Sequence, residues 1–275
     1  MVSNHSFDHG AGMSGDSASW TSWDLIVGGM IFALLTLLYM VAAAVSNRNY
    51  RTWPVYRYVC WIAGMVCVEL PLIGPLARLA AANFTIHMLG HLLLGMLGPL
   101  LIAFSAPMTL LLRSIPLPLA RRITRLLKSK PARFVAHPAV AALLNIGGLW
   151  VLYTSGLFMD MHHSLLLHIV VHVHVFAAGY LFTVSMIYVD LAPHRRSFQA
   201  RAIILIIAIA GHGILSKYIY AHPPDGVSSD QAKLGGMLMY YGGDAIDLIL
   251  VFWLCMQWYK SARPRPAASI LQALD

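Results

Sequence analysis

Long apolar runs, separated by short polar segments, follow one another along most of this chain. A bilayer core about 30 Å thick needs roughly 20 consecutive apolar residues to be crossed by one α-helix. We therefore predict an all-α, polytopic transmembrane helical bundle of about seven spans. The predicted spans are 24–45, 55–79, 84–112, 138–159, 164–189, 202–220 and 234–259.

The third predicted span is long and contains two prolines, Pro99 and Pro107. Proline inside a helix removes a hydrogen bond and collides with the preceding turn. We expect a kink or break at Pro107. The pattern as a whole predicts a polar extracytoplasmic tail over 1–23, a seven-helix transmembrane domain over 24–260 and a short cytoplasmic tail over 261–275.

Basic residues are distributed very unevenly between the loops. With the N-terminus outside and the C-terminus inside, sixteen of the 19 Lys and Arg residues fall in the inner loops and tail, and only Arg78, Lys217 and Lys233 fall outside. Because cytoplasmic loops of membrane proteins are enriched in Lys and Arg, this asymmetry predicts that orientation. The chain is accordingly expected to be a multi-pass protein of the cell (inner) membrane.

The composition supports a membrane protein. Only 11% of residues are charged, whereas soluble domains carry about 25%. The net charge of +8 fits basic cytoplasmic loops, and we expect no nucleic-acid partner. Segment 113–133 holds seven basic residues among Leu and Ile, a pattern typical of a cytoplasmic loop or an amphipathic helix on anionic membrane lipid.

Histidines are placed with metal-ligand spacing. His87 and His91 open the third predicted span, and His168 and His172 open the fifth. Residues four apart lie on one helix face, one turn from each other. Two imidazoles at that spacing can hold one metal ion.

The predicted topology brings these pairs to one depth. The third and fifth spans run in the same direction, so both pairs lie in the outer part of the membrane. Three further residues on other spans are expected near that level, namely Glu69, His212 and Met237. Because polar residues inside a membrane are costly and often mark function, we predict a metal site made by these seven residues.

Ligand chemistry favours copper. Imidazole binds copper, zinc, iron and nickel, and thioether sulfur favours Cu(I). The chain has 14 Met, and five lie close to the histidine level: Met88, Met96, Met161, Met237 and Met239. The sequence has no P-loop, nucleophile elbow or HExxH motif, so we predict a binding protein and not an enzyme.

Several motifs together resemble the CtaG-type cytochrome c oxidase assembly factors. They are His87-Met88-Leu89-Gly90-His91-Leu92-Leu93-Leu94, Ala106-Pro107-Met108-Thr109-Leu110-Leu111-Leu112-Arg113, His137-Pro138, the pair His168 and His172, and Asp230-Gln231 with Gly235-Gly236 and Met237 to Tyr240. The resemblance covers about 53–259. One departure is visible, because Tyr153, Thr154 and Ser155 stand where a His–x–Pro element often closes the fourth span of the family.

The resemblance implies a seven-helix membrane protein that loads copper into the oxidase, at its dinuclear CuA centre. The implied partner is the apo CuA-bearing subunit of cytochrome c oxidase. On this basis His87, His91, His168 and His172 are candidate copper ligands, and Asp230 and Gln231 are motif residues without an assigned role.

Two other functions remain open from the residues alone. A b-type haem protein could carry electrons with two histidines as axial ligands, although the two pairs at one depth do not favour transfer across the membrane. A metal or proton transporter would need polar groups in the inner half, where only Cys60, Asp190 and Asp247 are expected.

Overall fold

The computed structural model describes residues 22–190 and 195–263, and within these ranges every regular element is a helix. Six helices are long and apolar enough to cross a membrane, or seven when a bent pair counts as one span. This confirms the predicted all-α, multi-pass bundle. The long helices are α1 (Ser22–Asn49), α2 (Val55–Leu72), α12 (Leu165–Met186), α13 (Phe198–Ala221) and α14 (Ser229–Ala262).

The remaining elements are shorter and build two composite spans and the two ends of the bundle. They are α3 (Pro75–Ala82), α4 (Phe84–Leu92), η1 (Leu93–Leu97), α5 (Gly98–Ser105), α6 (Pro107–Ser114), α7 (Leu117–Leu127), α8 (Lys130–Val135), α9 (Pro138–Ala142), η2 (Leu143–Gly147), α10 (Gly148–Thr154) and α11 (Leu157–His163). The elements η1 and η2 are π-helical turns inserted into otherwise α-helical spans.

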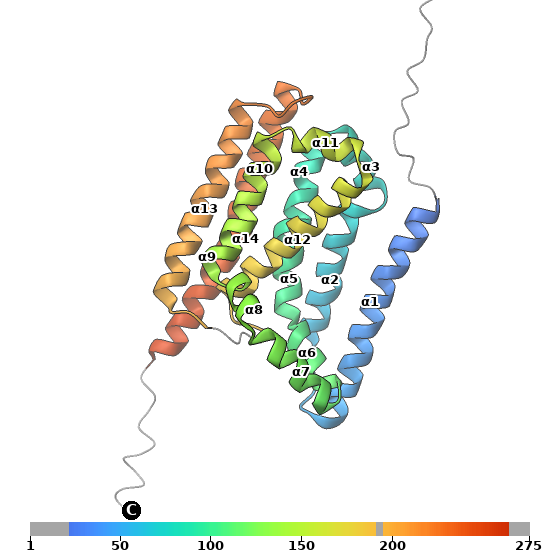
Figure 1. The fold of residues 1–275 in the computed structure, drawn as a ribbon, viewed down its shortest axis with the longest axis vertical. Coiled ribbons are helices and arrows are strands. Elements are labelled where there is room, and N and C mark those ends of the chain that lie inside the picture. Colours follow the sequence, from blue (N-terminus) through green and yellow to red (C-terminus); the bar gives the residue numbers. More distant parts are fainter. Residues whose placement is uncertain (1–21, 191–194, 264–275) are drawn as a thin grey trace, which may run out of the picture.

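The two ends of the bundle differ in chemistry (Figure 1). Helices α3 and α11 lie at one end, which we call the histidine end. Helices α6, α7 and α8 lie at the opposite end and carry six of the seven basic residues of 113–133, with Lys128 between α7 and α8, so we call it the basic end. Helix α7 buries none of its residues, as an amphipathic segment lying along a membrane surface would.

Close backbone contacts hold the central helices together. A Cβ on Gly179 of α12 would collide with the Gly95 carbonyl of η1, and a Cβ on Gly236 of α14 would lie 2.8 Å from the Ser216 carbonyl of α13. Membrane helices associate through such small residues because lipid supplies no hydrophobic driving force between them. These glycines therefore fix the spacing of the helices around the site.

The predicted second span, 55–79, is wrong at its C-terminal end. Helix α2 stops at Leu72, and Gly74 adopts a positive φ of 96° before Pro75 starts the separate helix α3. Glycine reaches this conformation without steric cost, and proline is well suited to a first helical turn. The chain therefore turns, and α3 covers the histidine end.

The predicted fourth span, 138–159, also ends too late. Helix α10 stops at Thr154, and the next helix, α11, is bent by 79° from it. Ser155 is extended, and its hydroxyl accepts a hydrogen bond from the Leu157 N–H. The polar run Thr154-Ser155-Gly156 thus interrupts the helix, and α11 folds over the end of the bundle.

The predicted break at Pro107 is confirmed. Ala106 is left-handed, with φ 53°, and separates α5 from α6. Asp190, just beyond α12, accepts hydrogen bonds of 2.8 Å from the backbone N–H groups of Met108 and Thr109. Because the first N–H groups of a helix lack partners in the helix, Asp190 satisfies them and ties α6 to the basic end of α12.

Candidate metal centre

A cavity of about 820 Å³ lies at the histidine end, between α3, α4, α10, α11 and α12. Its wall includes histidine, methionine and tyrosine side chains, and the residues that line it include no cysteine and no carboxylate. Six histidines line it: His87, His91, His162, His163, His168 and His172. The four histidines that the sequence placed on two predicted spans therefore face one common space.

The α4 pair is positioned by capping interactions at the start of that helix. The Asn83 side chain accepts a hydrogen bond from the Ile86 N–H, and the Gln231 side-chain oxygen accepts one of 2.9 Å from the Phe84 N–H. Gln231 belongs to α14, so this bond joins two spans at the level of His87. The local sequence around Gln231 does not reveal this role, because the contact spans 147 positions along the chain.

The α12 pair also follows a capped helix start, at Ser164. The His168 and His172 rings have centroids 4.1 Å apart. Nδ1 of His172 lies 2.8 Å from the His168 carbonyl, and because a carbonyl only accepts, Nδ1 carries the proton and donates it. The lone pair of His172 is therefore on Nε2, an arrangement common among metal-ligating histidines.

The third contribution comes from α11, whose His162 and His163 fall between the predicted fourth and fifth spans. His162 Nδ1 donates to the Phe158 carbonyl at 2.7 Å, which again leaves Nε2 with the lone pair. The His162 ring centroid lies 6.3 Å from that of His87, and Met161 lies beside it, buried, in the cavity wall. Only the bend after α10 brings these side chains over the cavity.

Aromatic side chains hold the His87 ring. Its Nε2 lies 3.1 Å from the Tyr153 hydroxyl, and its centroid is 5.1 Å from the Phe158 ring and 6.1 Å from the Phe84 ring. Phe84, Tyr153 and Phe158 are all buried. His87 is thus packed on its sides and also lines the cavity.

His91 lies deeper than His87 and links the cavity to the bundle interior. His91 is 7% exposed and His212 of α13 is 2% exposed, with ring centroids 6.3 Å apart and planes inclined by 28°. Nε2 of each ring has no hydrogen-bond partner among the described residues. Buried polar atoms are nearly always paired, so these two nitrogens are notable sites for a ligand.

The other two predicted site residues lie elsewhere. Glu69 is half-buried on α2 and faces α1, where a Cβ on Gly29 would lie 3.8 Å from its carboxylate. Met237 is 40% exposed. Neither side chain lines the histidine cavity, so the structure brings together four of the seven residues, with His212 against His91.

Ligand convergence is incomplete in this conformation. Across 22–190 and 195–263, no three His, Cys, Asp or Glu side chains come close enough to hold one metal ion together. The histidines surround a cavity and do not collapse into a cluster. The arrangement can therefore offer imidazoles in pairs, beside the Met161 thioether and the Tyr153 hydroxyl.

The model of the cytochrome c oxidase caa3 assembly factor family, Caa3_CtaG, matches residues 37–261. The chain belongs to this family. The match includes every histidine of the cavity, and it confirms the resemblance seen in the sequence. Assembly of cytochrome c oxidase is therefore the process with which this family is associated.

Mycobacterial proteins described as uncharacterized are also similar. One from Mycobacterium bovis is 28% identical over 191 residues, covering 67% of this chain and 29% of that protein. One from Mycobacterium leprae is 28% identical over 202 residues, covering 70% and 30%. The chain thus spans less than a third of the length of these relatives. No solved structure matches.

Proposed function

We propose that the chain binds copper in the histidine cavity and delivers it to the apo CuA-bearing subunit of cytochrome c oxidase during assembly. The single observation that carries the proposal is the convergence of six histidines from three helices on one cavity of about 820 Å³. The family's association with oxidase assembly supplies the context. The chain acts as a carrier, and no catalytic step is part of the proposal.

The donor set suits Cu(I). Imidazole and thioether are ligands that Cu(I) accepts, and His162 and His172 each present an Nε2 lone pair because their Nδ1–H groups bind backbone carbonyls. A carrier has to release its ion by ligand exchange. An open cavity with imidazoles in pairs serves this purpose better than a closed site with four fixed ligands, which is typical of structural metals.

The location of the cavity supports delivery at the outer face. The cavity lies at the end of the bundle opposite the basic helices (Figure 1). The positive-inside rule assigns the basic end to the cytoplasm. On this basis the histidine end faces out of the cell, and copper is handed over there.

Metal analysis of purified protein tests the binding step. We expect a His87→Ala, His91→Ala double variant to lose most of the copper that the wild type retains after passage over a mild chelator. His222→Ala is the matched control, because His222 is exposed beyond the end of α13 and does not line the cavity. Equal copper in wild type and double variant would contradict the proposal.

Transfer requires a second measurement. Cu(I)-loaded chain is mixed with the apo form of the soluble CuA-bearing domain, samples are oxidised by one electron per dinuclear centre with ferricyanide, and the absorption of the mixed-valence centre is measured. We expect the spectrum to form with loaded wild type and with the loaded His222→Ala control, and not with the double variant. The same spectra test the haem b alternative, because a Soret band in the purified chain would favour it.

A further inference from the structure

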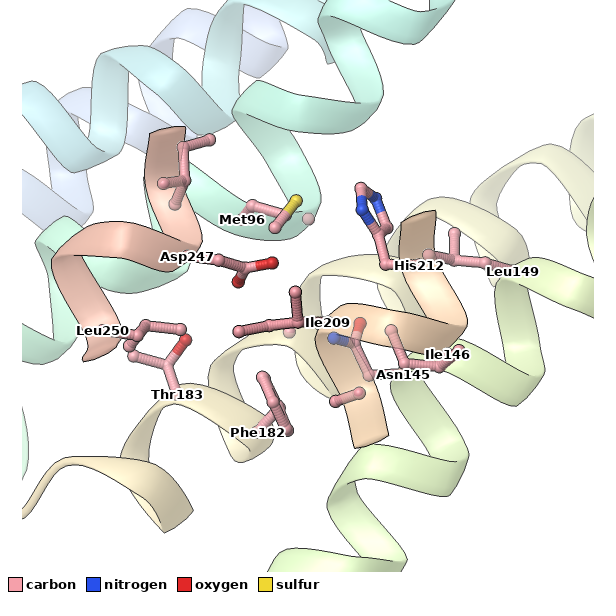
Figure 2. Close-up of a pocket in the computed structure, with 14 residues that line it drawn as sticks. Met96, Asn145, Ile146, Leu149, Phe182, Thr183, Ile209, His212, Asp247 and Leu250 are labelled. Atoms are coloured by element: carbon pink, nitrogen blue, oxygen red, sulfur yellow. The ribbon is translucent and has the colours of Figure 1, made fainter. Parts of the chain in front are cut away.

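Two π-helical turns from different spans meet at a second, smaller cavity deeper in the bundle (Figure 2). Segment η1 supplies Gly95 and Met96 to its wall, and η2 supplies Asn145 and Ile146. π-turns are rare and often occur at functional sites. The space is about 20 Å³, which holds a single water molecule or one ion.

Three side chains with metal-binding groups line this inner cavity: Met96, His212 and Asp247. Figure 2 shows them extending from three elements toward the same space. His212 is 2% exposed and its Nε2 is without a hydrogen-bond partner in the described part of the chain. Asp247 is 5% exposed, and no hydrogen bond from a described residue reaches its carboxylate.

The carboxylate in the wall of the inner cavity favours a cation as its occupant. An unpaired carboxylate within a membrane bundle is costly, and a bound cation offsets that cost. A monovalent ion balances the charge of Asp247, which is the one carboxylate among the residues that line the cavity. Thioether sulfur favours Cu(I), and imidazole binds copper among other metals, so Met96 and His212 together match a single Cu(I) ion.

The inner cavity is adjacent to the outer one. His91 lines the outer cavity, and its ring stacks on that of His212, which lines the inner cavity. Met96 follows His91 by five residues, which is about 7.5 Å along a helix. An ion held by His91 is therefore between one and two helical turns from Met96, which lines the inner cavity with His212 and Asp247.

We propose that this inner cavity is a second Cu(I) site, with Met96, His212 and Asp247 as its ligands. The proposal rests on the proposed function, because its ion arrives from the outer histidines. The chain then holds copper at two depths. The inner site stores one ion away from water, and the stacked pair of His91 and His212 connects it to the open outer cavity.

Copper stoichiometry under chelator competition tests the second site. Purified full-length chain in detergent is titrated with Cu(I) against a chelator of known affinity. We expect two bound ions in the wild type, and one in each of Asp247→Asn and Met96→Leu. The matched controls are Asp244→Asn and Met88→Leu, whose side chains do not line the inner cavity, and both should bind two.

X-ray absorption of the loaded protein provides a readout that a loss of folding does not mimic. Met96→Leu should lower the copper–sulfur scattering to that of the outer ion alone, while one copper stays bound by the outer histidines. Met96→Leu preserves volume and apolarity, so it keeps the test available should Asp247→Asn not fold.

The possible outcomes separate the two proposals. One ion in the wild type and in the Asp247 and Met96 variants, lost in His87→Ala, His91→Ala, would overturn the inner site and leave the proposed function intact. No copper in the wild type would overturn both. Two ions in the wild type that persist in Asp247→Asn and Met96→Leu would assign the second ion elsewhere and refute the inner site.

Discussion

The Tyr153 hydroxyl lies 3.1 Å from Nε2 of His87. Tyr153 is buried and lies in the last turn of α10. At this position the family resemblance led us to expect a His–x–Pro element. The contact joins the residue that departs from the family pattern to a candidate copper ligand. The hydroxyl is therefore the partner of one of the two ring nitrogens with which His87 can bind a metal.

Removal of this hydroxyl should therefore change copper binding directly. A neutral hydrogen bond contributes about 0.5–1.5 kcal/mol net, which corresponds to a factor of roughly 2 to 10 in affinity. We expect Tyr153→Phe to increase Cu(I) affinity by about that factor, measured by chelator competition, because His87 Nε2 is released. Tyr180→Phe is a control outside the cavity. Weaker binding in Tyr153→Phe would show that the hydroxyl orients the ligand instead.

Gln231 should stabilise the start of α4 and through it the position of His87. Gln231→Ala leaves the Phe84 N–H without its acceptor, and an unsatisfied buried donor costs about 1–3 kcal/mol. We expect a lower thermal unfolding midpoint and weaker copper binding. Gln231→Glu keeps an acceptor oxygen and should restore most of both. Lys233→Ala, an exposed change two residues along α14, should have little effect, and a comparable loss there would argue against this role.

Copper retention should depend on pH in a defined direction. Copper binds to the neutral imidazole, so protons compete with copper for the ring nitrogens as pH falls. We expect copper retention to be full at pH 8 and to fall progressively on acidification to pH 3, measured by metal analysis after dialysis. Retention that does not fall over this range would exclude imidazole ligation.

The orientation of the bundle is a separate prediction, tested by labelling. In a background with Cys60, Cys67 and Cys255 replaced by Ser, single cysteines are introduced as Ser229→Cys at the histidine end and Arg122→Cys on α7. An impermeant maleimide should label the first in intact cells and the second only in inverted vesicles, because basic segments stay in the cytoplasm. The reverse pattern would place the histidine cavity on the cytoplasmic side.

Much of the architecture follows from sequence because local patterns determine it. Apolar runs of sufficient length have to be helical in a membrane, where the backbone must satisfy its own hydrogen bonds. The break at Pro107 follows from the missing N–H of proline. The i, i+4 spacing of His87 with His91 and of His168 with His172 places each pair on one helix face whatever the rest of the chain does.

Contacts between segments distant in sequence determine which side chains face the cavity, and local sequence patterns do not reveal these contacts. The 79° bend after Thr154 brings His162 and His163 over the cavity, and a change of direction of that kind depends on how α11 packs on its neighbours. The rotation of each helix about its axis places Glu69 against α1 and leaves Met237 exposed. Equal depth in the membrane does not fix that rotation, so both residues had looked like ligands.

The sequence by itself thus determined that this is a helical membrane protein of the caa3 assembly factor family with two histidine pairs near one end. Tertiary structure decided that the pairs share a cavity, that α11 adds further imidazoles, and that His91 stacks on His212 above a smaller buried space. The reason is physical. Helix formation and membrane insertion depend on residues near in sequence, whereas a binding site depends on which faces of several helices the packing turns toward each other.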